Sequence, residues 1–129
     1  MASKIIDIHP HIISKDTQRY VIAPLGGKRS VWSAERPIDF ENLCASMTEA
    51  GVDKAAIVHS STTYGYDNTY MVDSIATQPK RFTGVGSVDF AALKPFVKPQ
   101  HIKVFEFSPA MPVEELKRGI EHVQRIWGA

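Results

Sequence analysis

The sequence predicts an α/β fold in which parallel β-strands alternate with α-helices. Apolar runs of strand length recur along the 129-residue chain, and segments with apolar residues at helical spacing separate them. The most apolar run, within KAAIVHSS at 54–61, is typical of a strand that helices cover on both faces. Because a strand–helix–strand order returns through a right-handed crossover, the strands should pair in parallel.

The first strand is expected at residues 5–8 and ends before Pro10, since proline cannot donate to a sheet ladder. His9 and His11 stand at its end. Residues 11–37 then show no sustained periodicity, and a loop of this length in a compact domain is usually functional or disordered. Its aromatic residues and arginines favour a functional loop, because disordered linkers are normally poor in aromatics.

The remaining elements follow in order along the chain. Asp39 is placed to cap a helix that Gly51 ends. Asn68 or Thr69 should cap the next helix, and Pro112 lies in the first turn of the last one. The expected elements are a helix at 40–50, a strand at 54–61, a helix at 69–78, strands at 81–90 and 101–107, and a helix at 112–127. Residues 91–100 contain two prolines and have the character of a linker.

The bulk composition is that of one globular domain over residues 1–129. A net charge of +1 gives no basic surface for nucleic acid or for an anionic membrane, so neither partner is expected. The single cysteine, Cys44, excludes an internal disulfide framework and fits a reducing compartment. No apolar stretch approaches the ~20 residues of a membrane span, and the run after MASK is too short for a signal peptide. We therefore expect a soluble, cytoplasmic protein.

Polar and titratable side chains gather where the predicted strands end. Ligands of parallel α/β proteins bind at these carboxyl ends, in the loops that follow the strands. The candidates are Asp7, His9 and His11 after the first strand, His59, Ser60, Ser61 and Thr62 after the second, Ser87 and Asp89 after the third, and Glu106 and Ser108 after the fourth.

The His-x-His spacing is the sharpest of these features. Residues two apart on a strand point to the same side, so His9 and His11 project together if strand geometry continues through Pro10. Two neutral imidazoles placed in this way can share one divalent ion. Asp7 lies on the face of His9 and is a candidate to orient it, or to form a salt bridge. The alternative is that Pro10 ends the strand and the two histidines are a solvated tip.

The other candidates each allow two interpretations. Asp89 suits a general base or ligand at a strand end, and it equally suits a helix or turn cap. His59 follows a very apolar strand, where a histidine is more often a core residue than a catalyst. Tyr64 and Tyr66, within TTYGYDN, can shape a substrate pocket or pack over the core. Cys44 lies on the apolar face of a predicted helix and reads as a core residue.

Two segments resemble a known family. DIHPHIIS and the stretch from RPIDFENLC to TGVGSVD are similar, in order and spacing, to the N-terminal part of the amidohydrolase-related family. Within its amidohydrolase 2 branch, this part resembles 2-pyrone-4,6-dicarboxylate lactonase-like hydrolases and aromatic-acid decarboxylases. The resemblance covers residues 4–90, whereas residues 91–129 diverge. It implies a TIM-like (β/α)8 barrel, which takes ~250 residues, so the chain should form about half of such a barrel.

The resemblance also implies site residues. In metal-dependent members, the histidines that match His9 and His11 bind zinc or manganese, which activates water and polarises the scissile carbonyl. In relatives that work without metal, these histidines contact the substrate. Ser60, Ser61 and Thr62 match a loop over the substrate carboxylate, and Tyr64 belongs to the same loop. The family's general-base aspartate lies on a late strand beyond the matched segment, so Asp89 is the candidate catalytic carboxylate only from its own place at a strand end.

The resemblance implies a metal-dependent hydrolase of a small carboxylated lactone or a cyclic amide or ester, with decarboxylation of an aromatic acid as a further option. Because the expected site is partial, a homodimer could complete it and would also cover exposed strand edges. The alternative is a truncated, non-catalytic half-barrel that binds a ligand or dimerises. A flavodoxin-like binding domain is disfavoured, since no Gly-rich phosphate loop follows the first strand.

Overall fold

The computed structural model describes residues 4–98 and 111–127 of the chain. These residues divide into two compact units, Met1–Ser87 and Val88–Ala129. The predicted strand at 101–107, with Glu106 and Ser108, lies outside the described residues.

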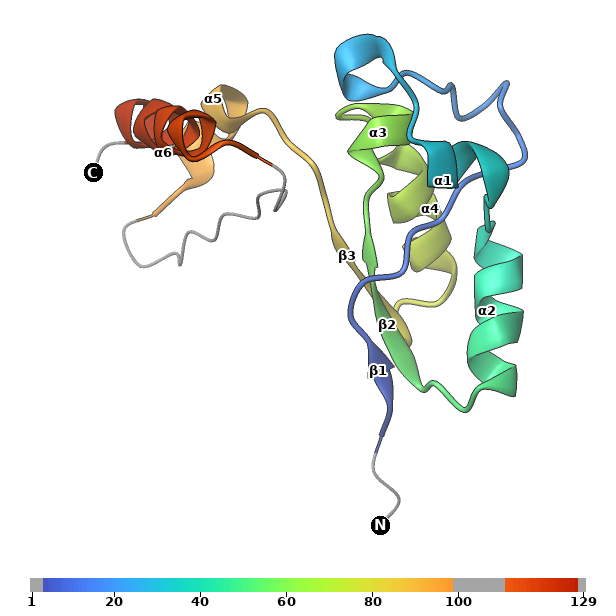
Figure 1. Ribbon diagram of the computed structural model, residues 1–129. Helices are drawn as coiled ribbons and strands as arrows, with labels where there is room; N and C mark the ends of the chain where they lie inside the picture. Colours follow the sequence, from blue (N-terminus) through green and yellow to red (C-terminus); the bar gives the residue numbers. More distant parts are fainter. Residues whose placement is uncertain (1–3, 99–110, 128–129) are drawn as a thin grey trace. The chain divides into compact units, whose positions relative to one another are not determined.

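The first unit contains a small sheet and the helices that flank it (Figure 1). Its elements are β1 (Ile6–Asp7), η1 (Leu25–Gly27), α1 (Val31–Glu35), α2 (Phe40–Glu49), β2 (Lys54–Val58), α3 (Ser61–Tyr64), α4 (Thr69–Thr77) and β3 (Phe82–Val85). Two of the helices, η1 and α1, lie in the long loop at 11–37, where the sequence shows no periodicity because each is only a single turn or little more.

The sheet confirms the predicted fold class. Its strands run in the order β1-β2-β3, and both pairs are parallel. Ile6 pairs with Lys54, and Ala55 pairs with Phe82 on the other side of β2. Helices α2 and α4 make the connections between successive strands. Parallel strands alternating with helices in an open sheet are the architecture of a partial TIM-like barrel.

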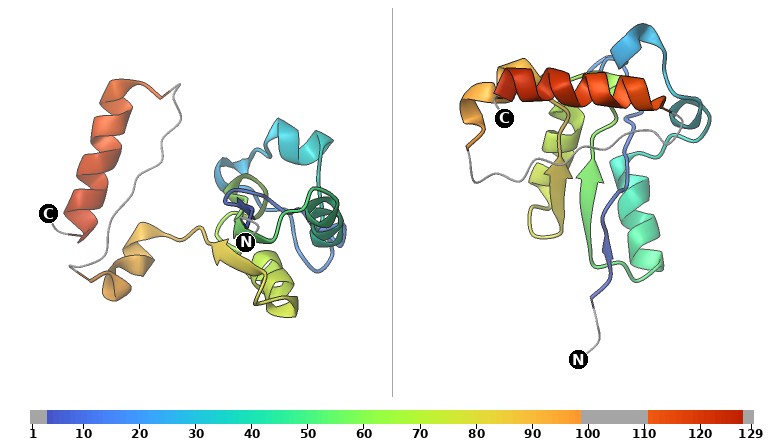
Figure 2. Two further views of the ribbon diagram at one scale, coloured as in Figure 1. Left: turned by 90° about the horizontal axis from the view of Figure 1, so that it is seen from below. Right: turned by 60° about the vertical axis from the view of Figure 1, so that its left-hand side comes forward.

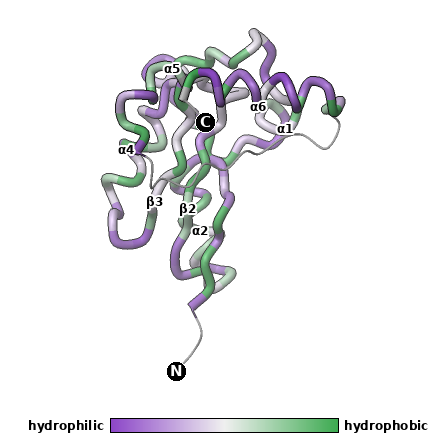
Figure 3. The backbone as a smooth tube through the Cα atoms, turned by 90° about the vertical axis from the view of Figure 1, so that its left-hand side faces the viewer, coloured by the Kyte–Doolittle hydropathy of each residue, from purple (hydrophilic) through white to green (hydrophobic). Residues whose placement is uncertain are grey.

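The core lies between the sheet and its two longer helices. Ala55 and Ile57 are 2% and 0% exposed, and they point to the same face of β2 because strand side chains alternate. Phe82 packs its ring against Phe40 of α2, with ring centroids 5.0 Å apart. Figure 2 shows α2 and α4 beside the strands, and Figure 3 shows the hydrophobic colour of β2. Burial of this one face holds the first unit together.

The opposite face of the sheet carries exposed apolar side chains, together with Lys54 and Thr83. Ile6, Ile8 and Val85 are 54%, 74% and 51% exposed. The continuous apolar pattern of β2 predicts two faces covered by helices, but among the described residues of the first unit only one face is covered in this way. A barrel explains the pattern, because its strands carry helices outside and enclose apolar side chains inside. The predicted self-association, which would cover exposed strand edges, stays a prediction.

Helix α2 begins and ends as its sequence predicts. The Asp39 carboxylate accepts the backbone N–H of Asn42 at 2.8 Å, and Gly51 follows the helix with φ of +71°. The start of α4 differs from the prediction. Asn68 occupies the cap position without a side-chain cap bond, and the Asp67 carboxylate accepts the N–H of Thr69 at 2.9 Å instead. The Asn68 side chain bonds the backbone of Ser87 instead.

The second unit contains α5 (Phe90–Leu93), η2 (Lys94–Phe96) and α6 (Val113–Trp127). Strand β3 ends at Val85, five residues earlier than predicted. Asp89 caps α5, and its carboxylate accepts the N–H groups of Ala91 and Ala92 at 2.8 and 3.0 Å. Glu114 of α6 pairs with Lys117 at 3.0 Å. Within residues 4–98 and 111–127, no helix combines the length and the apolar character that crossing a bilayer requires.

Candidate functional site

The two histidines after β1 lie together. Their ring centroids are 5.0 Å apart, and the ring planes are nearly perpendicular at 79°. The carbonyl of Pro10 accepts the N–H of Val58 at 2.8 Å, which keeps the histidine segment alongside β2 beyond the last residue of β1. His9 is exposed and His11 is half-buried. The pair therefore has one solvent-facing ring and one ring held against the protein.

His11 is fixed from two sides. Its Nδ1 atom lies 2.8 Å from the carbonyl oxygen of Val58, at the end of β2. Its ring stacks on Trp32 of α1, with centroids 5.0 Å apart and an interplanar angle of 27°. Because a carbonyl can only accept, the neutral form of this imidazole carries its proton on Nδ1 and its lone pair on Nε2. Nε2 is thus the His11 atom that is able to accept a proton or to bind a metal.

Asp7 acts on the backbone of this segment. Its carboxylate accepts the backbone N–H of His9 at 3.1 Å. Asp7 is a sequence-based candidate to orient the His9 ring, but among the described residues no hydrogen bond joins Asp7 to that ring. Asp7 therefore shapes the turn that carries the histidines.

His59 is a buried residue at the end of β2. It is 6% exposed, and its Nε2 lies 2.9 Å from the carbonyl oxygen of Gly65. Burial lowers the pKa of His59, and the Gly65 carbonyl opposes this effect only in part. The ring is therefore neutral near pH 7 and links the two ends of the loop at 59–65. These contacts correspond to the core role, one of the two roles that the sequence allows for His59.

The hydroxyl residues after β2 differ in accessibility. Ser60 is 4% exposed and its Oγ lies 2.9 Å from the hydroxyl of Thr63. Thr62 is exposed and donates to the Oγ of Ser30 at 2.9 Å, so this loop is tied to the segment before α1. Ser61 is half-buried. Ser61 and Thr62 are thus the members of the predicted substrate loop that reach the surface.

Tyr64 is an anchor of the same loop. It is 4% exposed, and its phenol oxygen accepts the backbone N–H of Ser14 at 2.8 Å. Burial raises its pKa. Tyr66, two residues on, is 49% exposed and is the tyrosine of this loop that a ligand can reach.

The Asn68 side chain holds the backbone segment that follows β3. Its side-chain amide donates to the carbonyl of Ser87 at 2.8 Å and accepts the N–H of Ser87 at 3.0 Å. Gly86 makes room for this contact, because a Cβ at that position would lie 3.0 Å from the Asn68 side-chain oxygen. Asp89, the predicted catalytic carboxylate, belongs to the second unit and caps α5 there.

The residues present do not complete a metal site. Within the part of the chain that the structure describes, no three histidine, cysteine or acidic side chains are grouped so that they could hold an ion. His9 and His11 supply two imidazoles, whereas a catalytic zinc normally takes three protein ligands.

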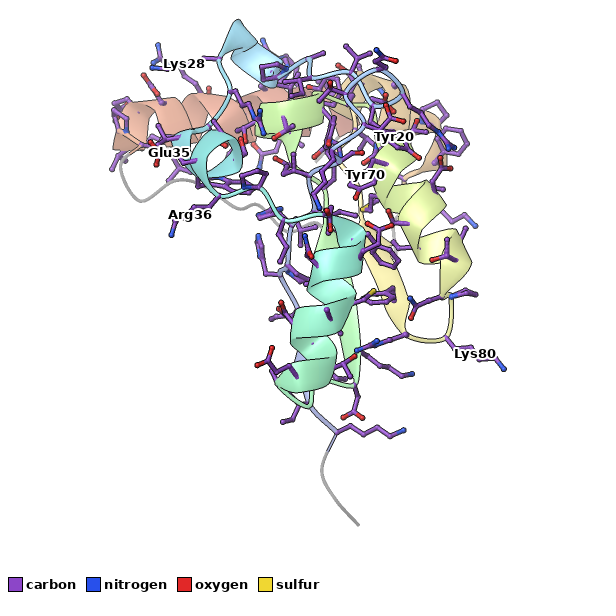
Figure 4. The ribbon with its side chains drawn as sticks, turned by 90° about the vertical axis from the view of Figure 1, so that its right-hand side faces the viewer. Tyr20, Lys28, Glu35, Arg36, Tyr70 and Lys80 are labelled. Atoms are coloured by element: carbon purple, nitrogen blue, oxygen red, sulfur yellow. The ribbon has the colours of Figure 1, made fainter. Side chains whose placement is uncertain are left out.

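A hollow of about 540 Å³ lies away from the histidines. It is lined by residues of the 14–20 segment, the start of α2 and α4, among them Tyr20 and Tyr70, whose ring centroids are 4.7 Å apart (Figure 4). Two ion pairs, Lys15–Asp39 and Arg19–Asp73, already join four of its charged groups to one another. None of the predicted site residues lines it.

Two residues of the 11–37 loop contact the predicted site residues and were not singled out by motif: Ser30 and Trp32. Trp32 stacks on His11, and Ser30 bonds Thr62. The available signal was the aromatic and basic character of an unusually long loop.

No family model matches the chain, and no curated protein matches it. Solved structures do. One, with citric acid bound, is of a candidate 2-pyrone-4,6-dicarboxylic acid hydrolase from Acinetobacter baumannii, at 20% identity and a TM-score of 0.50 over 69% of this chain and 30% of that one. Another, from Pseudomonas putida and of the same candidate class, has 22% identity and a TM-score of 0.50 over 72% and 33%. The chain thus spans about a third of these structures, and the likeness shows the fold of a partial barrel.

Proposed function

We propose that this chain carries part of a hydrolase site for a small carboxylated lactone or a related cyclic ester or amide. The observation that carries the proposal is the His9–His11 pair at the carboxyl end of a parallel sheet, with its rings 5.0 Å apart and His11 anchored to Val58. The likeness in fold to candidate pyrone-dicarboxylate hydrolases supports the reaction class. Decarboxylation of an aromatic acid is the other reaction that the sequence resemblance implies.

His11 is the proposed base. Its Nε2 lone pair takes a proton from water, whose oxygen adds to the lactone carbonyl carbon, and the ring C–O bond then breaks. The His11 imidazolium then gives the proton from Nε2 to the leaving oxygen, which restores the neutral imidazole and balances atoms and charge. The Val58 carbonyl accepts from Nδ1–H and stabilises the imidazolium that forms. His9, exposed beside it, contacts the substrate.

The predicted zinc or manganese cofactor belongs to the proposal only in a limited sense. His9 and His11 would be two of its ligands, and a bound ion would activate water. The described residues do not complete its ligand set, so the proposed chemistry uses the imidazoles alone.

The substrate carboxylate is assigned to the loop after β2. Ser61 and Thr62 offer hydroxyl groups at the surface of this loop, and Tyr66 offers an exposed ring. Ser60 and Tyr64 hold the loop in place through buried hydrogen bonds.

A second candidate is a non-catalytic domain of the same ancestry that binds a carboxylate. The observation that favours it is the lack, among the described residues, of a third metal ligand grouped with His9 and His11.

One experiment separates the two candidates. The purified chain is assayed for hydrolysis of 2-pyrone-4,6-dicarboxylate with and without a chelator, and its divalent-metal content is measured. Turnover that His11→Ala abolishes and that Arg36→Gln leaves intact supports the hydrolase, and chelator sensitivity then decides on the metal. Binding of the dicarboxylate without turnover supports the second candidate. Turnover unchanged in the variant with both His9→Ala and His11→Ala contradicts the proposed site.

A further inference from the structure

Arg29 is a half-buried cation held in a fixed position. Its Nε donates to the hydroxyl of Ser33 at 3.2 Å, and one terminal nitrogen, Nη2, donates to the Ser33 carbonyl. Ser33 is 0% exposed, so its oxygen atoms provide a rigid support. The guanidinium is therefore held by one edge, and its other terminal nitrogen, Nη1, forms no hydrogen bond within the described residues.

No carboxylate in the described part of the chain forms an ion pair with this arginine. Among residues 4–98 and 111–127, the ion pairs of the first unit are Lys15–Asp39 and Arg19–Asp73, and none includes Arg29. Half-buried charges in proteins are usually paired, because leaving water without a counter-charge is costly. A guanidinium that is fixed on one edge and unpaired on the other is suited to receive an anion.

Hydroxyl groups connect Arg29 to the candidate site. The hydroxyl of Thr62 donates to Ser30 at 2.9 Å, and the hydroxyl of Ser30 donates to Ser33 at 2.8 Å. Ser33 in turn accepts from Arg29, so the loop after β2 and the arginine are joined through two serines. Trp32, beside Ser33 in the chain, stacks on His11.

From these contacts we propose that Arg29 binds the carboxylate of the substrate and selects an anionic ligand for the His9–His11 site. The inference rests on the proposed function, because it names the residue that sets its substrate class. The planar fork of a guanidinium matches a carboxylate with two parallel N–H···O bonds, which a lysine ammonium cannot reproduce. Arg29 is thus a substrate-binding residue beyond the loop at 60–64.

Calorimetric titration with isophthalate tests the proposal, since this planar dicarboxylate cannot be hydrolysed. Arg29→Gln should weaken binding by about tenfold to a hundredfold, the usual effect of losing a charge-assisted pair. The isophthalate affinity of Arg29→Lys should lie between those of the wild type and Arg29→Gln. The matched control is Arg36→Gln, which removes an exposed arginine of the same loop that points to solvent (Figure 4) and should bind as the wild type does. The neutral dimethyl ester should bind weakly to every variant.

Equal isophthalate binding by wild type and Arg29→Gln would overturn the inference. So would a wild-type protein that binds the dimethyl ester as tightly as isophthalate, or one that does not bind isophthalate. Thermal unfolding and circular dichroism establish that each variant is folded, and Arg29→Lys keeps the test valid if Arg29→Gln does not fold. Inorganic phosphate in a parallel titration shows whether the site prefers carboxylates.

The same variants keep this proposal distinct from the hydrolase proposal. Arg29-dependent binding without any turnover would contradict the hydrolase and retain the anion site. Turnover with an unchanged KM in Arg29→Gln would retain the hydrolase and contradict the anion site.

Discussion

The Nδ1 atom of His11 lies 2.8 Å from the carbonyl oxygen of Val58, the last residue of β2. This contact joins the segment after β1 to the end of the neighbouring strand. It fixes the tautomer of the imidazole, and with the stacking on Trp32 it sets the direction in which Nε2 points. The candidate site depends on this relationship more than on the spacing of the two histidines.

His11→Asn should therefore separate structure from chemistry. The asparagine amide can still donate to the Val58 carbonyl, whereas His11→Ala leaves that carbonyl without its partner. We expect His11→Ala to be less stable than His11→Asn by about 1 kcal/mol, measured by urea unfolding. Both variants lack Nε2 and should lose hydrolysis. Equal stability of the two variants would show that the Val58 contact contributes nothing.

Gly65→Ala should destabilise the first unit strongly. Gly65 has φ of +62°, and a Cβ there would lie 2.8 Å from the carbonyl oxygen of Ala23. Gly51 is the matched control, because its φ is +71° and a Cβ there would meet nothing within 4 Å. Gly51→Ala should cost about 1–2 kcal/mol for the positive φ alone. Gly65→Ala should cost more by the steric clash with the backbone, and thermal unfolding of the two variants measures the difference.

Asp39 should make stability depend on acid. A hydrogen bond from Lys15, together with the N–H of Asn42, lowers the pKa of this buried carboxyl. The unfolded chain then binds a proton more readily than the folded chain, so the contribution of Asp39 is complete above its ordinary pKa of about 4 and is lost as the pH falls through the lower folded pKa.

The measurement is the free energy of unfolding between pH 6 and pH 2.5. Asp39→Asn should flatten the acid limb, and Asp39→Ala should also cost about 1 kcal/mol at pH 7 by loss of the helix cap. Glu49→Gln, at the exposed end of the same helix, serves as the control. An acid limb that Asp39→Asn leaves unchanged would contradict this prediction.

His59 should make stability depend on pH in a higher range than Asp39 does. Burial lowers its pKa, so between the folded pKa and the ordinary value of about 6.5 the unfolded chain binds more protons than the folded chain. Stability should fall as the pH decreases through this window. His59→Gln can retain the bond to Gly65 and should reduce the slope of stability against pH. His122→Gln, which replaces an exposed histidine of α6, should leave the slope of stability against pH unchanged.

Much of the fold can be predicted from the sequence because its signals are local. The Asp39 cap and Gly51 define α2, and the helical stripe after Pro112 defines α6. The apolar run predicts a strand at 54–61, of which Lys54–Val58 forms β2. The short α1 and α3 escape prediction, since a helix of four or five residues has no measurable period. The end of β3 is misplaced because Asp89 turns out to cap a helix.

The sequence by itself determined the parallel α/β class, the clustering of polar groups at strand ends and the adjacency of His9 and His11. These follow from the period of apolar residues and from the alternation of side chains along a strand. Only the tertiary structure decided which nitrogen of His11 is free, that Tyr64 and His59 are buried anchors, and that Arg29 reaches the loop after β2 through Ser30 and Ser33. These contacts join residues up to 50 positions apart. No local pattern encodes them, because they exist only once the strands are side by side.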